Sequence, residues 1–185
     1  APDMSRPRLL CITGLTASGK SALAMELATA LGAELLSVDS MQVHRGLDVG
    51  TAKPTAEERA RVRHHGIDLV GPEERFSAGE FASYAREILR EAGSRGVPVL
   101  AVGGTGLYLR ALLHGLAPVP AADEALRVSL RQEEDRRRGS MHARLEGVDP
   151  EAAARIDRAD LVRLERAIEV FEATGRPMSA WQAEH

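Results

Sequence analysis

Short apolar runs alternate with stretches of helical periodicity over the first 115 residues of the chain. Continuous apolar runs bounded by turn residues are typical of strands buried in a parallel sheet. Residues 97–102 form such a run, residues 9–13 are a predicted strand, and residues 34–39 are a second predicted strand that ends in a carboxylate. A further short strand is possible at 67–70. A helix-forming run follows the first of these strands and ends before Gly32, a typical C-terminal stop.

The clearest helix signal begins at Ser77. Ser77 and Glu80 have the spacing of a capping box, in which each side chain accepts a hydrogen bond from the other residue's backbone N–H. The apolar residues predicted to share one face of this helix are Phe81, Tyr84, Ile88 and Ala92. Strands that alternate with helices form a parallel sheet covered on both faces. The pattern therefore predicts an α/β fold.

The pattern changes at Pro118 and Pro120, after which no strand signal follows. Asp149 and Pro150 predict the N-cap and first position of a helix. A longer helix is predicted over residues 160–174, with an apolar stripe formed by Leu161, Leu164, Ile168 and Phe171. A last helix begins near Ser179.

These patterns predict three parts of the chain. Residues 1–117 are expected to form the α/β core, and residues 118–176 a helical insert. Residues 177–185 are expected to begin the return of the chain to the core.

Composition narrows the function classes only slightly. The 24 Lys and Arg residues nearly balance 27 Asp and Glu residues, so any contact with a polyanion must come from local placement of charge. The single cysteine, Cys11, permits no intrachain disulfide, which fits a reducing cytosol. No apolar run approaches the roughly 20 residues of a membrane span. We therefore expect a cytoplasmic monomer without membrane contact.

Residues 14–21 match the phosphate-loop pattern G-x-x-x-x-G-K-[ST] at every fixed position. The match lies between a predicted strand and a predicted helix, where backbone N–H groups can converge on phosphate oxygens. Lys20 can reach a terminal phosphate, and the Ser21 hydroxyl can ligate a Mg²⁺ that bridges phosphates. A glycine-containing turn without a ligand is the alternative. We predict that a di- or triphosphate binds the loop formed by Gly14, Leu15, Thr16, Ala17, Ser18, Gly19, Lys20 and Ser21.

Ligands of parallel sheets lie beyond the carboxyl ends of the strands. Three such ends are the phosphate loop, Asp39 and residues 103–105, and we expect them to converge on one crevice. Asp39 is compatible with three roles: a Mg²⁺ ligand, a general base, or the cap of the following turn. The third strand ends in glycines instead of an aspartate, which weakens an ATP-hydrolase interpretation.

Two other groups leave alternatives open. Lys20 and Lys53 are the only lysines in a chain with 22 arginines, and a compact ammonium suits a phosphate site. Lys53 is therefore either a site residue or a solvated loop lysine. His64 and His65 with Asp68 suggest a metal site, but adjacent side chains diverge and no third ligand has suitable spacing.

The arginines of the helical part also allow two interpretations. Arg163 and Arg166 are three residues apart and share a helix face opposite the apolar stripe. They form either a contact with a phosphate backbone or an ordinary charged surface. Residues 136–138, three arginines after an acidic run, are typical of a solvated helix face.

Several blocks, taken in order, resemble the tRNA dimethylallyltransferases, or tRNA isopentenyltransferases. The blocks are residues 14–21, 39–43, 45–54, 64–68, 76–78 with Phe81, 103–108 and 160–175. The blocks from Asp39 to Pro54 are the most specific, because a bare phosphate loop occurs in very many proteins. The resemblance extends over nearly the whole chain but matches only the N-terminal part of a typical member, without the family's C-terminal arginine-bearing segment.

The resemblance implies a P-loop NTPase-like parallel sheet flanked by helices, with a helical insert domain. It implies transfer of a dimethylallyl group from dimethylallyl diphosphate to N6 of the tRNA adenosine 3′ of the anticodon, with release of diphosphate. The phosphate loop would then hold dimethylallyl diphosphate with Mg²⁺ on Ser21, and Lys20 would stabilise the departing diphosphate. Asp39 matches the family's general base, and Thr16 matches a hydroxyl near the reacting end.

The implied macromolecular partner is tRNA, bound through its anticodon stem-loop. The implied contact positions are Asp39, Ser40, Met41, Gln42, Thr105, Arg127, Val162, Arg163, Leu164, Glu165 and Arg166. The chain departs from the family at Leu15, His44 and Val162, where proline, tyrosine and glutamine are usual. Two alternatives stay open: a small-molecule kinase that uses ATP in the same loop, and prenyl transfer to a free adenine nucleotide.

Overall fold

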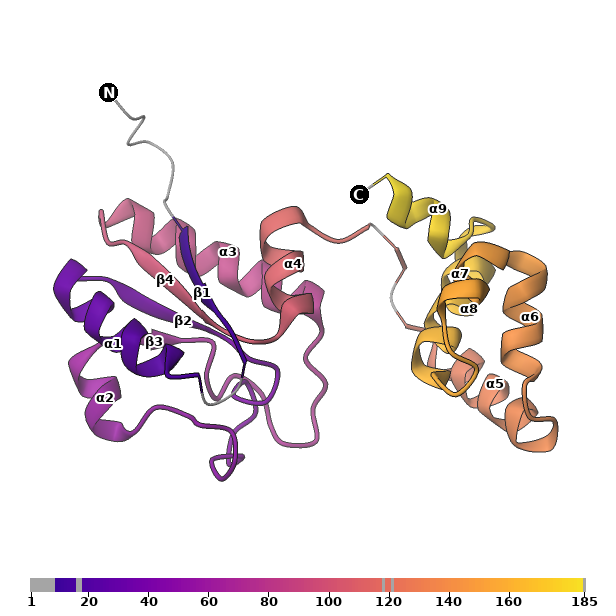
Figure 1. Cartoon of the computed structure of the whole chain (residues 1–185), viewed down its shortest axis with the longest axis horizontal. Helices are drawn as coiled ribbons and strands as arrows, with labels where there is room; N and C mark the ends of the chain where they lie inside the picture. Colours follow the sequence, from indigo (N-terminus) through magenta and orange to yellow (C-terminus); the bar gives the residue numbers. More distant parts are fainter. Residues whose placement is uncertain (1–8, 16–17, 118, 121, 185) are drawn as a thin grey trace. The chain divides into compact units, whose positions relative to one another are not determined.

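The structure is a computed structural model that describes residues 9–15, 18–117, 119–120 and 122–184 (Figure 1). It consists of two compact units, residues 1–115 and 116–185. Among the described residues, no helix has the length and apolar character needed to cross a membrane.

The first unit is built on a parallel sheet of four strands. The strands are β1 (Leu9–Thr13), β2 (Glu34–Val38), β3 (His64–His65) and β4 (Val99–Gly103). Their order in the sheet is β1-β4-β2-β3, with Val99 of β4 in register with Leu9 on one side and Glu34 on the other. Because all pairs are parallel, the carboxyl ends of the strands lie at one edge.

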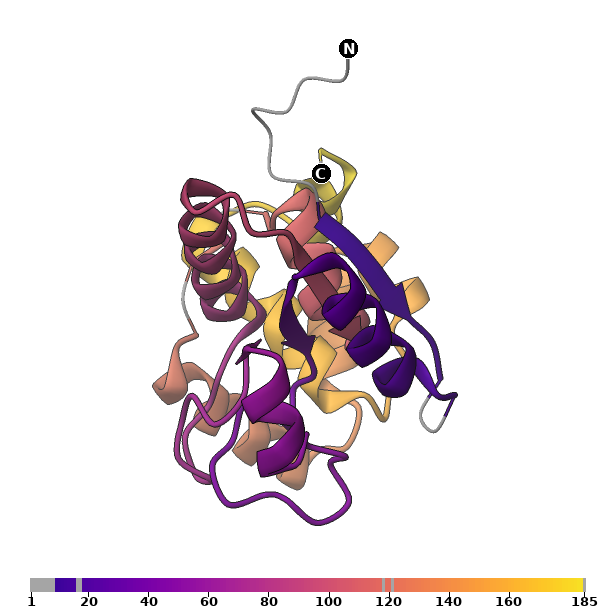
Figure 2. The same cartoon turned by 90° about the vertical axis from the view of Figure 1, so that its left-hand side faces the viewer.

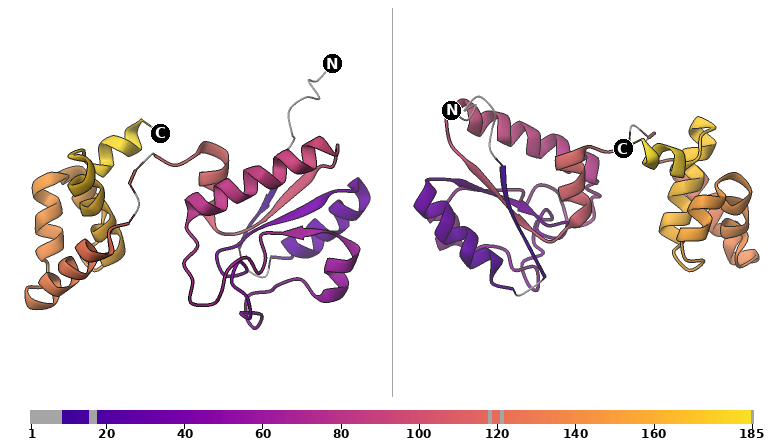
Figure 3. Two further views of the ribbon diagram at one scale, coloured as in Figure 1. Left: turned by 180° about the vertical axis from the view of Figure 1, so that it is seen from behind. Right: turned by 45° about the horizontal axis from the view of Figure 1, so that its top comes forward.

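Helices cover both faces of this sheet (Figures 2 and 3). The helices are α1 (Lys20–Leu31), α2 (Ala56–Arg61), α3 (Ala78–Ser94) and α4 (Gly106–His114). Leu35 and Leu100 point toward a cluster that contains α1 residues, whereas Leu36 and Ala101, the next residues along, point toward α3 and α4. This alternation places one apolar core on each face. The predicted α/β fold is confirmed.

Helix α3 begins as the sequence predicts, with both hydrogen bonds of the Ser77–Glu80 capping box present. Phe81 is fully buried and stacks on Tyr108 of α4, with ring centroids 4.3 Å apart. Ala82 and Ala85 are buried beside it, whereas Tyr84 of the predicted face is only half-buried. The buried face of α3 therefore includes small alanines, and it is broader than the face predicted from the larger apolar side chains.

The short strand predicted at 67–70 is wrong in position. The strand that pairs with β2 is His64–His65, and Val70 makes only an isolated bridge with His44. Asp68 has a left-handed backbone with φ of 56°, which interrupts an extended run. The apolar residues after it hydrogen-bond the segment around Val43 instead of the sheet.

The second unit contains only helices among its described residues. They are α5 (Glu124–Arg136), α6 (Ser140–Val148), α7 (Pro150–Arg155), α8 (Leu161–Thr174) and α9 (Met178–Ala183). Its core contains Leu130, Leu145, Leu164 and Ile168. The predicted stripe of α8 is confirmed at Leu164 and Ile168, while Leu161 remains 36% exposed at the start of the helix.

Asp149 joins the last helices of this unit. Its carboxylate caps α7 through the N–H of Ala152 and also accepts hydrogen bonds from the backbone N–H and hydroxyl of Ser179. It is 1% exposed. Helix α9 therefore packs against α7 and α8 within the second unit. The expected limits of core and insert, and the return of the chain to the core from residue 177, stay predictions.

Candidate active site

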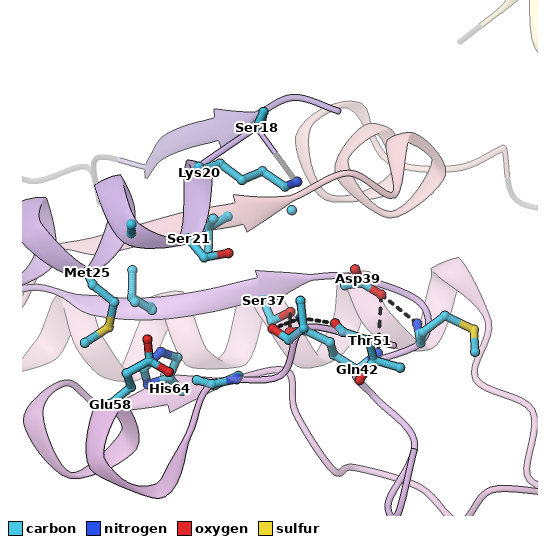
Figure 4. Close-up of a pocket in the computed structure, with 18 of the residues that line it drawn as sticks. Ser18, Lys20, Ser21, Met25, Ser37, Asp39, Gln42, Thr51, Glu58 and His64 are labelled. Carbon is cyan, nitrogen blue, oxygen red and sulfur yellow. Dashed lines mark hydrogen bonds between the residues drawn. The ribbon is translucent and has the colours of Figure 1, made fainter. Parts of the chain in front are cut away.

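A pocket of about 550 Å³ opens beyond the carboxyl ends of β2 and β4. Its walls come from the start of α1, the residues after β2, and the loop 50–54. Figure 4 shows Lys20 and Ser21 on one side, with Asp39, Gln42 and Thr51 across from them. The lining also includes Gly103, so the predicted convergence of three strand ends on one crevice is confirmed.

The phosphate loop supplies the side of the pocket nearest α1. Gly19 precedes the helix in a left-handed conformation with φ of 80°, and among the described residues no side chain caps the first turn. Backbone N–H groups at the start of such a helix are suited to bind an anion. The ammonium of Lys20 donates to the carbonyl of Leu15 at 2.9 Å, a neutral acceptor that a phosphate could replace. Thr16 and Ala17, which the sequence placed in this site, lie outside the described residues.

The donor set facing the pocket fits a divalent cation of the magnesium type. Ser21 and Asp39 both line the pocket, and they offer a hydroxyl and a carboxylate oxygen. Oxygen donors combined with phosphate oxygens are the ligands that Mg²⁺ prefers. Among the described residues, no group of three or more His, Cys, Asp or Glu side chains lies close enough to hold a metal without substrate oxygens.

The two carboxylate oxygens of Asp39 have different surroundings. Its Oδ1 accepts hydrogen bonds from the N–H groups of Met41 at 2.8 Å and Gln42 at 3.3 Å, so it caps the turn that follows β2. In the part of the chain that the structure describes, no group hydrogen-bonds Oδ2. Capping and proton transfer are therefore compatible, because each uses a different oxygen.

The end of β4 holds the Asp39 turn from the other side. The Thr105 hydroxyl accepts a hydrogen bond from the N–H of Ser40 at 3.0 Å. A Cβ at Gly103 would lie 2.1 Å from the carbonyl oxygen of Val38, so only glycine fits between the two strand ends. The predicted contact positions 39–42 and Thr105 are thus brought together.

Gln42 connects the Asp39 turn with the opposite wall of the pocket. Its side-chain carbonyl accepts from the Ser37 hydroxyl at 2.7 Å, and its amide donates to the carbonyls of Thr51 and Ala52 at 2.8 and 3.0 Å. Sequence reasoning missed Ser37 and the carbonyls of the loop. The loop carbonyls lie in the specific block 45–54, which was matched without a role for each residue, whereas Ser37 lies in none of the matched blocks.

Of the two interpretations of Lys53, the structure contradicts the solvated loop lysine. Its side chain is 3% exposed and ion-paired with Asp48 and Asp68, so it is not a solvated loop lysine. It does not line the pocket either. Burial favours a lower pKa for Lys53, but its hydrogen bonds to Asp68 and Asp48 outweigh burial and raise that pKa.

The side chains of the adjacent residues His64 and His65 lie in different surroundings. His64 lines the pocket and its Nδ1 lies 2.7 Å from the carbonyl of Val62, whereas His65 bonds Glu34 at 2.7 Å. Burial lowers the pKa of His64, which keeps the imidazole neutral at pH 7. Glu58 lies near it at the same end of the pocket (Figure 4) and forms a capping box with Thr55, a spacing present in the sequence but overlooked.

The predicted contact positions of the second unit differ widely in exposure. Val162 is 72% exposed and the Arg163 side chain 74% exposed, so both can meet a ligand. Leu164 is fully buried, and Glu165 is 2% exposed. The latter two side chains can therefore influence binding only through the packing of α8.

Arg127 and Arg166 are engaged within their own unit. Arg127 donates to both oxygens of Glu169 at 2.6 and 2.9 Å and is 17% exposed. Arg166 bonds Glu169 and the carbonyl of Pro120. Burial favours a higher pKa for Glu169, but its bonds to Arg127 and Arg166 outweigh burial and lower that pKa. Arg166 is thus engaged within its unit, whereas Arg163 is exposed, and contact of either with a phosphate backbone stays a prediction.

The chain matches two related families. The IPP transferase model matches residues 42–185 and the isopentenyl transferase model matches residues 7–69. The tRNA dimethylallyltransferase of Geobacter metallireducens is 50% identical over 99% of this chain and 60% of its own length. The chain thus spans about 60% of the length of this curated relative.

Solved structures agree. The full-length tRNA isopentenylpyrophosphate transferase from Bacillus halodurans is 41% identical, with a TM-score of 0.60 over 93% of this chain and 57% of that chain. A eukaryotic dimethylallyltransferase acting on tRNA has a TM-score of 0.79 over 97% of this chain and 45% of that chain. At 24% identity, the second likeness concerns the fold alone.

Proposed function

The chain belongs to the IPP transferase family, and from this premise we propose that it carries the catalytic core of a tRNA dimethylallyltransferase. The proposed enzyme transfers a dimethylallyl group from dimethylallyl diphosphate to N6 of the tRNA adenosine 3′ of the anticodon. Diphosphate is the second product.

The observation that carries this proposal is the pairing of two groups in one pocket. The start of α1 supplies anion-binding N–H groups, and Asp39 faces the same pocket with one carboxylate oxygen uncommitted among the described residues. An acceptor of a proton and a cradle for a leaving diphosphate are the two components that an alkylation of an amine by an allylic diphosphate needs.

The proposed reaction forms a carbon–nitrogen bond, breaks a carbon–oxygen bond and transfers one proton. The N6 nitrogen attacks the allylic carbon, the carbon–oxygen bond to diphosphate breaks, and the proton of N6 passes to Oδ2 of Asp39. Lys20 and the loop N–H groups stabilise the negative charge that grows on the departing diphosphate. Bound Mg²⁺, held by Ser21 and phosphate oxygens, would neutralise part of the same charge. Thr16 stays a predicted contact near the reacting end.

The proposed tRNA contacts come from both units. In the first unit they are the turn Asp39–Gln42 and Thr105, which one hydrogen bond already joins. In the second unit the exposed candidates are Val162 and Arg163 at the start of α8. An unstacked base of the anticodon loop suits an enzyme that reacts with the edge of an adenine.

The proposal is tested by incubating the full-length protein with labelled dimethylallyl diphosphate and Mg²⁺, together with tRNA, AMP, or neither. Label in tRNA is the expected result, and mapping it to the adenosine 3′ of the anticodon identifies the product. Label in AMP alone would favour prenyl transfer to a free nucleotide. ATP consumption without label transfer would favour a small-molecule kinase, and either outcome would overturn the proposal.

A further inference from the structure

The ammonium of Lys53 is buried at a point where three segments of the first unit meet. It donates to the carbonyl of His44 at 2.6 Å, to Asp48 at 2.9 Å and to Asp68 at 2.7 Å. A lysine ammonium has three N–H donors, and each of them has one acceptor here. The side chain therefore has no donor left for a ligand.

The charges of this cluster balance, because it contains two cations, Lys53 and Arg59, and two carboxylates, Asp48 and Asp68. Asp68 also accepts from Arg59 through its second oxygen at 2.8 Å, and Asp48 is 71% exposed. Burial favours a higher pKa for Asp68, but hydrogen bonds from Lys53 and Arg59 outweigh burial and lower that pKa. Lys53 and Asp68 consequently stay ionised at neutral pH.

The backbone beside the cluster is strained. Ala52 and Asp68 have φ values of 49° and 56°, and they are the only non-glycine residues with positive φ in the part of the chain that the structure describes. A Cβ makes this conformation unfavourable, so surrounding contacts must hold it. Ala52 is adjacent to Lys53, and Asp68 is its ion-pair partner. Lys53 is thus the neighbour of one strained residue and the ion-pair partner of the other.

The strained loop is also a wall of the pocket. Gly50, Thr51, Ala52 and Pro54 line it. The amide of Gln42 binds the carbonyls of Thr51 and Ala52, and the N–H of Gln42 binds Oδ1 of Asp39. A continuous set of contacts therefore leads from the ammonium, through the loop and Gln42, to the Asp39 carboxylate.

We propose that Lys53 is a positioning residue, which fixes the wall 50–54 and, through Gln42, the orientation of Asp39 in the pocket. This inference rests on the proposed prenyl transfer for its catalytic consequence. Lys53 does not touch substrate. It acts by holding the loop in a conformation that the loop's own residues disfavour.

The residue type supports this role. Three acceptors converge on one point in a space that excludes solvent, which suits the compact ammonium of lysine. A planar guanidinium directs its donors in a fork and would not reach the same three oxygens. This requirement accounts for a lysine at this position in a chain that otherwise uses arginine for all cations except Lys20.

The test compares Lys53→Met with the wild type in the full-length protein. We expect kcat for prenyl transfer to fall by about 10- to 100-fold, because a small displacement of a catalytic group is costly. The Kd for inorganic diphosphate with Mg²⁺ should stay close to the wild-type value, since the phosphate loop is not part of the cluster. Hydrogen exchange at the N–H groups of Met41 and Gln42 should become faster.

Arg95→Met is the matched control. Arg95 pairs with Glu34, a buried carboxylate at the start of β2 that does not line the pocket. Its loss should lower Tm but leave kcat of the folded protein and exchange at residues 41–42 unchanged. A second variant, Lys53→Met with Asp68→Asn, removes the more buried of the two carboxylates that lose the lysine. It should regain part of the lost Tm without regaining kcat.

Two results would overturn the inference: wild-type kcat in Lys53→Met, or kcat that recovers together with Tm in the double variant. If the wild type transfers no dimethylallyl group, the proposed function fails. The role of Lys53 is then decided by two other measurements: hydrogen exchange at the N–H groups of residues 41–42 and the Kd for inorganic diphosphate. Unchanged exchange there in Lys53→Met would then reject it.

Discussion

The pocket of the first unit and the arginines Arg127 and Arg166 of the second unit differ in how their charged side chains are paired. In the pocket of the first unit, Lys20 bonds only a neutral carbonyl among the described residues, and Asp39 keeps one oxygen uncommitted there. In the second unit, Arg127 and Arg166 bond the buried carboxylate of Glu169. Charged groups that are not engaged in ion pairs are suited to bind ligands, whereas ion-paired groups mainly stabilise the fold. The number of arginines in a segment is therefore a poor guide to a polyanion surface.

The largest effect is expected at Asp39. Asp39→Asn keeps an oxygen that can accept from the N–H groups of Met41 and Gln42, so the turn should stay intact. Without a base, turnover should fall by about 10²- to 10⁴-fold while affinity for inorganic diphosphate is nearly unchanged. Single-turnover kinetics and calorimetry measure the two quantities. Full activity would leave Asp39 only its capping role, and a loss of affinity that extra Mg²⁺ restores would make it a metal ligand.

Substitution of Lys20 should have a different effect from substitution of Asp39. Lys20→Ala removes the cation that meets charge on the departing diphosphate, so kcat and diphosphate affinity should fall together, with kcat lowered by about 10²- to 10³-fold. Initial rates and direct binding of inorganic diphosphate provide the measurement. The contrast with Asp39 disappears if the variant binds diphosphate as well as the wild type does.

Paired charges of the first unit should affect stability instead of turnover. Hydrogen bonds from Arg95 and His65 lower the pKa of Glu34 to about 2, below its ordinary value of 4.5. Because the folded-state pKa is the lower one, this pairing stabilises the protein fully above pH 4.5. The contribution, up to about 3 kcal/mol, is lost as pH falls from about 4.5 toward 2.

Denaturant unfolding of the wild type and Glu34→Gln across this pH range measures that contribution. The difference between the two curves should shrink as the medium becomes more acidic. Parallel curves would show that Glu34 gains nothing from its partners.

The smallest effects separate two arginines of the second unit. Arg127→Met leaves Glu169 with fewer partners and should lower the free energy of unfolding by about 1–3 kcal/mol. Arg163→Met, at a 74% exposed side chain, should change it by less than about 0.5 kcal/mol. If Arg163 contacts tRNA, its loss should raise KM for tRNA a few-fold and make the salt slope about one unit less steep.

Chemical denaturation and tRNA titrations at several salt concentrations compare these two variants. Equal destabilisation by both would contradict the distinction between paired and exposed arginines. Unchanged KM and salt slope in Arg163→Met would make the start of α8 an ordinary charged surface.

Local signals in the sequence predicted most of the fold. Ser77 with Glu80, Asp149 with Pro150, and Gly32 fix helix ends through contacts a few residues apart, and all three are present. The strand at 64–65 was missed because its pairing partner, β2, is distant in sequence. Its residues, two histidines, have no strand signature of their own.

The same limit applies to the site. The phosphate loop and Asp39 follow directly from strand ends, which local patterns reveal. The cluster around Lys53 depends on Asp68 and on the carbonyl of His44, which only the folded chain brings together. Likewise, Glu165 and Glu169 look like surface residues on a helical wheel, yet arginines on α5 and α8 allow their burial.

The different positions of the two Asp39 carboxylate oxygens have a practical consequence. Since one oxygen shapes the turn and the other faces the pocket, Asp39→Asn separates shape from chemistry with a change of a single atom. The altered protein should still assemble its pocket and bind its substrates, but it should not convert them. Immobilised on a resin, this variant would retain the RNA molecules that the proposed reaction modifies, and sequencing them would reveal the range of targets.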